Sequence, residues 1–304
     1  MRPREVTSGG VSQLDALLPP DMARRAEEIG VRKAAMDTVT AFTLAVLAGA
    51  FIALGGVFAT TALAGAGSAP WGAIRVLAGV AFSVGLVLVV VGGAELFTGN
   101  SLIVMAWASR RVSTWALLRN WLVVFAGNFV GAVGTAALVY LAGTHRSGGG
   151  AVGATALAIA HAKVQLGFTQ AVALGVLGNT LVCLAVWLTL SARSTADRVL
   201  AIVPPISAFV ATGFEHSVAN MYFVPFGLLI ASLDGGFAAT ALERSLPALT
   251  WGAFLGRNLL PVTIGNVIGG AGLVGLVYWF VYLRPRGAEE RAAHRPDRQG
   301  EPAA

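Results

Sequence analysis

The chain has 304 residues, of which 56% are hydrophobic and only 12% charged, and its mean hydropathy is +0.74. Soluble domains carry about 25% charged residues, so this composition excludes an ordinary water-soluble protein and indicates that a lipid bilayer is the solvent. The formal net charge of +6 does not indicate a nucleic-acid partner, because the basic residues follow membrane topology.

Residues 1–36 are rich in charge and are predicted to form a cytoplasmic N-terminal segment. Within it, Met22, Ala26 and Ile29 recur at helical spacing, which predicts an amphipathic helix over 21–36 on the inner membrane surface. Asp21 is the expected N-cap of this helix.

Six runs between residues 37 and 284 are almost free of charge, and each exceeds the roughly 20 residues that cross a hydrocarbon core. Strands of an outer-membrane barrel would be about half as long and would alternate in polarity, so the prediction is six transmembrane helices in one domain. The runs are Thr38–Ile74, Val76–Ser109, Asn120–Thr144, Val164–Ala192, Val199–Leu233 and Asn258–Leu283.

Two further segments complete the predicted organisation. The loop 145–163 contains three consecutive glycines and is expected to be irregular. Residues 285–304 combine mixed charge with prolines and are predicted to be a disordered cytoplasmic tail.

The basic residues predict the orientation. Most of the 21 Lys and Arg residues precede residue 34, follow residue 283, or lie in the two segments 110–119 and 193–198. By the positive-inside rule these segments and both termini are cytoplasmic. The opposite side is expected to hold only Arg75, Arg146, Lys163, Arg244 and Arg257.

The two halves of the chain repeat the same pattern. Gly93, Glu95 and Asn100 of the second run recur at the same offsets in the fifth run, as Gly213, Glu215 and Asn220. Similar matches pair the first run with the fourth, where Phe42 is set against Phe168, and the third with the sixth, where Asn128 is set against Asn266. Each half has three spans, so the second half is inverted, a plan that places a substrate site near the midplane.

The second and fifth spans are predicted to be broken. As one straight helix the run Val76–Ser109 would extend about 50 Å, and the fifth run has a similar length and contains Pro204, Pro205 and Pro225. Exposed backbone is tolerated at membrane depth only where protein or a water-lined cavity satisfies it. The half-helix N-termini would then favour an anion at the centre.

Two kinds of polar residue stand at the predicted breaks. Glu95 and Glu215 either line the path or, as we favour, accept backbone N–H bonds and support the breaks, together with Asn100 and Asn220. His216 has Leu96 as its repeat partner, so symmetry does not require it, and imidazole can donate to an anion or pass a proton to a weak acid.

These stretches resemble the formate/nitrite transporter family. The matching stretches are Gly93-Ala-Glu-Leu-Phe-Thr-Gly-Asn100, Asn120-Trp-Leu-Val-Val-Phe-Ala-Gly-Asn-Phe-Val-Gly131, Gly178-Asn-Thr-Leu-Val-Cys-Leu-Ala-Val-Trp187, Gly213-Phe-Glu-His-Ser-Val-Ala-Asn220 and Asn258-Leu-Leu-Pro-Val-Thr-Ile-Gly-Asn-Val-Ile-Gly-Gly270. The resemblance implies a homopentamer of aquaporin-like protomers in a bacterial inner membrane, each protomer with its own pore.

The resemblance also implies roles for individual residues. Thr98 is expected to face His216 between two apolar constrictions, Lys163 to mark the outer anion entrance and Asn179 to face the pore. The constriction residues it implies are Phe82, Leu86, Leu96, Phe97, Val182 and Phe209.

The expected function is a membrane channel for small monovalent anions of weak acids. Spans four to six resemble the formate branch, whereas Glu95–Asn100 resembles the nitrite branch, so formate is expected and nitrite and hydrosulfide remain alternatives. Passage is expected to depend on pH, with His216 transiently converting formate to formic acid. A neutral-solute pore is a weaker alternative, and the absence of a metal cluster, nucleophile–base pair or nucleotide loop argues against an enzyme, a cofactor or a bound metal.

Overall fold

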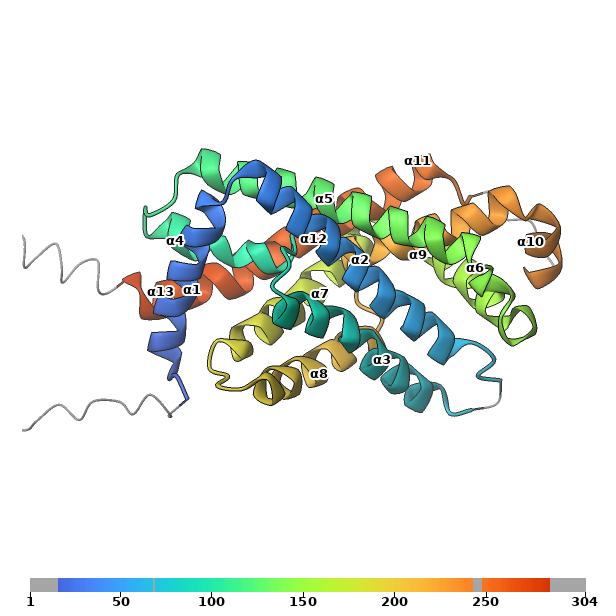
Figure 1. The fold of residues 1–304 in the computed structure, drawn as a ribbon, viewed down its shortest axis with the longest axis horizontal. Helices are drawn as coiled ribbons and strands as arrows, with labels where there is room; N and C mark the ends of the chain where they lie inside the picture. The colour runs from blue at the N-terminus through green and yellow to red at the C-terminus, as the bar shows by residue number, and fades with distance from the viewer. Residues whose placement is uncertain (1–15, 68, 243–247, 285–304) are drawn as a thin grey trace, which may run out of the picture.

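The computed structural model of the protein describes residues 16–67, 69–242 and 248–284, and these residues form a bundle of helices (Figure 1). The predicted tail 285–304 and the first fifteen residues lie outside this description. The first half contains α1 (Pro19–Ala35), α2 (Thr38–Leu63), α3 (Trp71–Gly92), η1 (Gly99–Ile103), α4 (Val104–Ala108) and α5 (Thr114–Leu141). The second contains η2 (Thr144–Arg146), η3 (Gly148–Gly150), α6 (Ala151–Val164), α7 (Phe168–Thr189), α8 (Thr195–Ala211), α9 (Ser217–Leu233), α10 (Gly235–Leu242), α11 (Trp251–Ala253), η4 (Phe254–Leu259), α12 (Leu260–Val267), η5 (Ile268–Leu276) and α13 (Val277–Tyr282).

Among the described residues, five helical runs are long and apolar enough to cross a membrane: α2, α3, α5, α7 and the run Trp251–Tyr282. The last run includes two π-helical segments, η4 and η5. The fifth span consists of two shorter helices, α8 and α9. The chain is therefore a multi-pass membrane protein, as the apolar runs predicted.

Both predicted breaks are present, and both begin at a glycine. Gly93 follows α3 with a φ of 76°, and Gly213 follows α8 with a φ of 77°, a left-handed conformation that side chains disfavour. Pro204 and Pro205 lie inside α8 rather than at the break. The glycines, not the prolines, thus end the first half-helix of each broken span.

The two halves are inverted copies, as the repeat predicted. The predicted alignment of the first span with the fourth, however, was out of register. At the breaks, the N–H of Glu95 donates to the carbonyl of Leu44, and the N–H of Glu215 donates to that of Leu174, both at 3.2 Å. Leu44 and Leu174 are therefore equivalent, so the match of Phe42 to Phe168 is displaced by four residues. Four residues is close to one helical turn, so the same apolar face was matched one turn too early.

The repeat extends to the short helices that precede each half. α1 ends just after Lys33, and α6 ends just after Lys163, each lysine five residues before the start of the next span. The two helices lie at opposite ends of the molecule, α1 beside α13 and α6 beside α10 (Figure 1).

Two local predictions about these short helices were wrong. The loop 145–163 is not irregular, because its glycines only form the turn of η3 and the alanine-rich stretch after them forms α6. The helix α1 begins at Pro19 after Leu18, so Asp21 is not its N-cap. A proline supplies a favourable first helical residue without a side-chain cap, since its missing N–H needs no partner there.

Candidate functional site

The two breaks meet in the middle of the bundle, where they bring together two polar side chains that are far apart in the sequence. Thr98 directly precedes η1, and His216 is the N-cap of α9. The Thr98 Oγ1 and His216 Nε2 atoms lie 2.8 Å apart, and both side chains are buried, with exposed fractions of 0% and 2%. The predicted pair is therefore present.

The hydrogen bonds of His216 define its tautomer. The backbone N–H of Ala219 donates to Nδ1 at 3.1 Å, so in the neutral ring the proton is on Nε2 and is donated to Thr98 Oγ1. Because Thr98 Oγ1 accepts this bond, its own hydroxyl proton is left to donate to a passing group.

Two buried asparagines hold the backbone of the breaks in place. The Asn128 side chain donates to the carbonyls of Ala45 and Glu95, at 2.8 and 2.9 Å, and accepts from the N–H of Phe97 at 2.9 Å. Unpaired backbone groups at membrane depth are costly, and this amide satisfies two of them, the carbonyl of Glu95 and the N–H of Phe97, while its bond to Ala45 ties the break to α2.

Asn266 repeats the arrangement in the second half. It donates to the carbonyls of Gly175 and Glu215 and accepts from the N–H of Ser217 at 2.8 Å. Both broken spans thus depend on one asparagine from the last span of their own half.

A lysine–glutamate pair lies beside each break. Lys33 Nζ is 2.5 Å from Glu95 Oε1, and Lys163 Nζ is 2.7 Å from Glu215 Oε1. The glutamates also accept from the amides of Asn100 and Asn220, at 2.8 and 2.6 Å. The expected backbone N–H donors are not the partners of these carboxylates; the amides of both glutamates instead donate to neighbouring helices, as described above.

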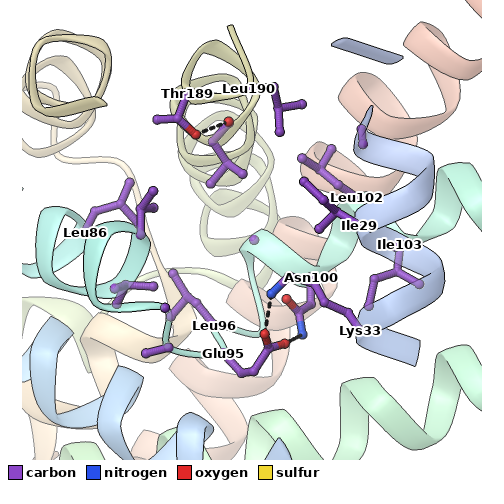
Figure 2. Close-up of a pocket in the computed structure, with 18 residues that line it drawn as sticks. Ile29, Lys33, Leu86, Glu95, Leu96, Asn100, Leu102, Ile103, Thr189 and Leu190 are labelled. Atoms are coloured by element: carbon purple, nitrogen blue, oxygen red, sulfur yellow. Dashed lines mark hydrogen bonds and ion pairs between the residues drawn. The ribbon is translucent and has the colours of Figure 1, made fainter. Parts of the chain in front are cut away.

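The α1-side vestibule is a cavity that opens on one side of the breaks (Figure 2). Lys33 and Asn100 point toward the Glu95 carboxylate in it, and Leu86 and Leu96 form part of its apolar wall. It combines one ion pair with a mostly apolar lining.

The α6-side vestibule opens on the other side of the breaks and contains His216 together with the pair Lys163–Glu215. Phe82 and Phe209 line its deep end; their ring centroids are 5.9 Å apart, and the Phe209 ring is 5.9 Å from that of His216. Phe82 and Leu86 are one turn apart on α3, about 6 Å along its axis, so a thin apolar layer separates the two vestibules.

Four residues implied by the resemblance line neither vestibule: Thr98, Phe97, Asn179 and Val182. The ring of Phe97 packs against Phe125, with centroids 5.0 Å apart. Asn179 donates to the carbonyls of Thr98 and Asn266 and to Ser101. Val182 is buried in the hydrophobic core.

Two cations of the site were not singled out from the sequence. The sequence indicates Lys33 only as an inner positive charge on the amphipathic helix over 21–36, although its spacing to the next span equals that of Lys163, which could have identified it. Arg75 lines the α6-side vestibule, and no repeated motif marks it.

At the α6 end of the molecule, outside the spans, Asp234 receives a hydrogen bond from Arg146 at 2.9 Å, and His145 lies 3.4 Å away. The Arg146 guanidinium, with smaller contributions from the Phe237 N–H and His145, lowers the pKa of Asp234. This cluster joins the turn before α6 to the start of α10.

Comparison with known proteins identifies this architecture. The family model described as formate/nitrite transporter matches residues 20–280. The formate channel FocA of Escherichia coli K12 is 46% identical over 273 residues, covering 89% of this chain and 96% of the relative, and FocA of Haemophilus influenzae is 38% identical over 86% and 93%. A solved structure described as a pentameric formate channel with formate bound is 40% identical, with a TM-score of 0.76 over 81% of this chain and 98% of its own. The chain therefore belongs to the formate/nitrite transporter family, whose members are channels and transporters.

Proposed function

We propose that this protein is a formate channel in which Thr98 and His216 receive the anion between the two vestibules. The observation that carries the proposal is the buried Thr98–His216 hydrogen bond, which lies where two polar breaks interrupt an apolar layer. The similarity to proteins described as formate channels supports formate as the substrate.

The apolar layer sets the barrier that the site must lower. A bare carboxylate loses its water at Phe82 and Leu86, and desolvation of an isolated ion in apolar surroundings is prohibitive. The hydroxyl proton of Thr98 is positioned to donate to the anion at that point, and a charge-assisted hydrogen bond of this kind is among the stronger ones.

Proton transfer would lower the barrier further, because formic acid is neutral. In this step His216 takes up a proton at Nδ1, its Nε2 proton passes to Thr98 Oγ1, and the hydroxyl proton of Thr98 passes to a formate oxygen. Protonation of Nδ1 opens its hydrogen bond from Ala219, which costs about 1 kcal/mol. Acidic conditions favour this step, so formate uptake rises as pH falls.

The test is flux in proteoliposomes at two pH values, with His216→Asn as the decisive variant. Asn can still donate to Thr98 but does not titrate, so we expect formate flux to persist while its dependence on pH disappears. Thr98→Ser keeps the hydroxyl and serves as the control, whereas Thr98→Ala is expected to reduce formate flux at both pH values. An unchanged pH dependence in His216→Asn would reject proton transfer through His216, but it would not contradict formate transport by the protein.

Substrate choice is tested in the same vesicles. We expect formate to pass faster than nitrite and hydrosulfide, and far faster than glycerol in a swelling assay. Faster nitrite or hydrosulfide would reassign the substrate within the family, and glycerol permeation equal to that of formate would refute anion transport.

The assembly and orientation belong to the same proposal. Exposed apolar side chains on α5, such as Leu122 and Leu138 at 71% and 67%, suit contact with lipid or with another protomer. We propose a homopentamer in a bacterial inner membrane with both ends cytoplasmic, so that the α1-side vestibule faces the cytoplasm. Native mass spectrometry tests the pentamer, and labelling of single cysteines placed in α1 and η2 of the Cys183→Ser protein tests the orientation. The protein has no proposed enzymatic role.

A further inference from the structure

The α6-side vestibule contains a cation that the α1-side vestibule lacks. Arg75, in the second turn of α3, lines the α6-side vestibule with Lys163, Glu215 and His216. Only Lys33 and Glu95 are charged among the residues that line the α1-side vestibule. The repeat offset that relates Glu95 to Glu215 sets Thr195 opposite Arg75, so the arginine breaks the symmetry of the pore.

The Arg75 side chain is held in place by the end of α8. Its Nε donates to the carbonyl of Ala211 at 3.2 Å, and its Nη2 donates to the carbonyl of Val210 at 2.7 Å. These carbonyls carry the negative end of the helix dipole, and the Trp71 ring lies 5.7 Å from the guanidinium carbon. The Arg75 side chain is half-buried at the vestibule wall.

The other charges of both vestibules cancel within their own pairs. Lys163 is paired with Glu215, and Lys33 with Glu95. Among the described residues no carboxylate lies within ion-pair distance of Arg75, whose hydrogen bonds go to neutral carbonyls. The α6-side vestibule therefore has a net positive charge at Arg75, and the α1-side vestibule has none.

Arg75 also lies on the approach to the apolar layer. Phe82 follows it by seven residues on α3, which is about 10 Å along the helix axis. A unit charge at that distance changes the local concentration of a monovalent anion by about twofold to tenfold, depending on the effective dielectric.

We propose that Arg75 is the residue that concentrates the anion in the α6-side vestibule, a role that the sequence suggested for Lys163. This inference rests on the proposed anion transport. A passive pore has the same low-concentration permeability in both directions, so the signature of Arg75 is not rectification. The signature is instead a half-saturating anion concentration on the α6 side that is lower with Arg75 than without its charge. A second signature is that salt added to the α6 side alone reduces the flux.

The experiment measures formate flux in proteoliposomes of defined orientation for wild type, Arg75→Gln and Arg75→Lys. On the α6 side, Arg75→Gln is expected to raise the half-saturating concentration about twofold to tenfold with little change in maximal flux. From the α1 side its half-saturating concentration stays at the wild-type value. Arg75→Lys keeps the charge and is expected to stay near wild type.

Salt added to one side distinguishes an effect of the Arg75 charge from an effect of its hydrogen bonds to the end of α8. Sulfate added to the α6 side, with sucrose balancing the osmolarity of the other side, screens a charge over about 10 Å at 0.1 M ionic strength and 3 Å at 1 M. Wild type and Arg75→Lys are expected to lose flux at low formate, while Arg75→Gln does not respond.

Three results overturn the inference. The first is an unchanged half-saturating concentration in Arg75→Gln. The second is an equal loss of maximal flux in Arg75→Gln and Arg75→Lys, which would make Arg75 only a cap of α8. The third is a wild-type flux that does not respond to salt on the α6 side, a result that needs no variant to fold. If wild type passes no formate, the proposed function fails instead, and the same comparison is made with nitrite.

Discussion

Asn128 is the side chain on which the break in the second span depends most, and its replacement by alanine gives a prediction with a defined magnitude. The substitution removes the partner of two backbone groups in the break, the carbonyl of Glu95 and the N–H of Phe97, and also a bond to the carbonyl of Ala45 inside α2. Each unsatisfied buried group costs about 1–3 kcal/mol. Side-chain hydrogen bonds in membrane proteins average only about 0.6 kcal/mol, since their groups find other partners.

The burial of this site indicates which of these two energy estimates applies. Asn128 has an exposed fraction of 0%, and the helix break leaves the carbonyl of Glu95 and the N–H of Phe97 without an intrahelical partner. Two such groups cost about 2–6 kcal/mol, and because water can enter and partly satisfy them, we expect Asn128→Ala to lower the free energy of unfolding by the lower part of this range, about 2–4 kcal/mol.

Denaturant unfolding of the detergent-solubilised protein, followed by circular dichroism, measures this effect. Asn266→Ala, the equivalent change in the second half, is expected to give a similar loss. Thr61→Ala is the control, because it removes one exposed bond to the carbonyl of Val57 and is expected to cost less than about 0.5 kcal/mol. A loss for Asn128→Ala no larger than that for Thr61→Ala would refute the argument that the asparagines hold the breaks.

Three further predictions concern stability. Gly213→Ala is expected to cost about 1–2 kcal/mol, because the φ of 77° is strained for a residue with a Cβ, as thermal unfolding would show. Lys163→Met leaves the buried Glu215 carboxylate without its cation and is expected to cost about 3 kcal/mol, whereas adding Glu215→Leu recovers most of the loss. The lowered pKa of Asp234 means that its carboxylate stabilises the fold above its unfolded pKa of about 3.9 and loses this effect as pH falls through the folded value. Asp234→Asn is therefore expected to lower Tm at pH 7, with the difference from wild type vanishing at acid pH.

Matched controls make these results interpretable. Gly72→Ala, in α3 with open space around it, is expected to leave stability unchanged or slightly raised; a loss equal to that of Gly213→Ala would contradict the backbone explanation. A double variant of Lys163 and Glu215 no more stable than Lys163→Met would contradict the argument from unpaired charge. A Tm difference for Asp234→Asn that is constant from pH 7 to pH 3 would exclude the carboxylate as its source.

The sequence by itself determined the elements whose causes are local. Long apolar runs require the membrane as solvent, wherever their neighbours lie. The glycines at 93 and 213 mark the breaks because a left-handed φ is a property of a single residue, and both were found where the repeated motif predicted them. The inverted repeat could be recognised in the sequence for the same reason, since each half needs the same residue types at its own break.

Only the tertiary structure decided which side chains meet. Thr98 and His216 are 118 residues apart, and the family resemblance, not their spacing, supplied the expectation that they pair. The sequence also did not predict three other features: the pairing of Lys33 with Glu95, the register of the first and fourth spans, and the position of Arg75 against the end of α8. Hydrophobicity and backbone preference act residue by residue, whereas charge neutralisation and hydrogen bonding depend on distances that exist only once the helices have packed.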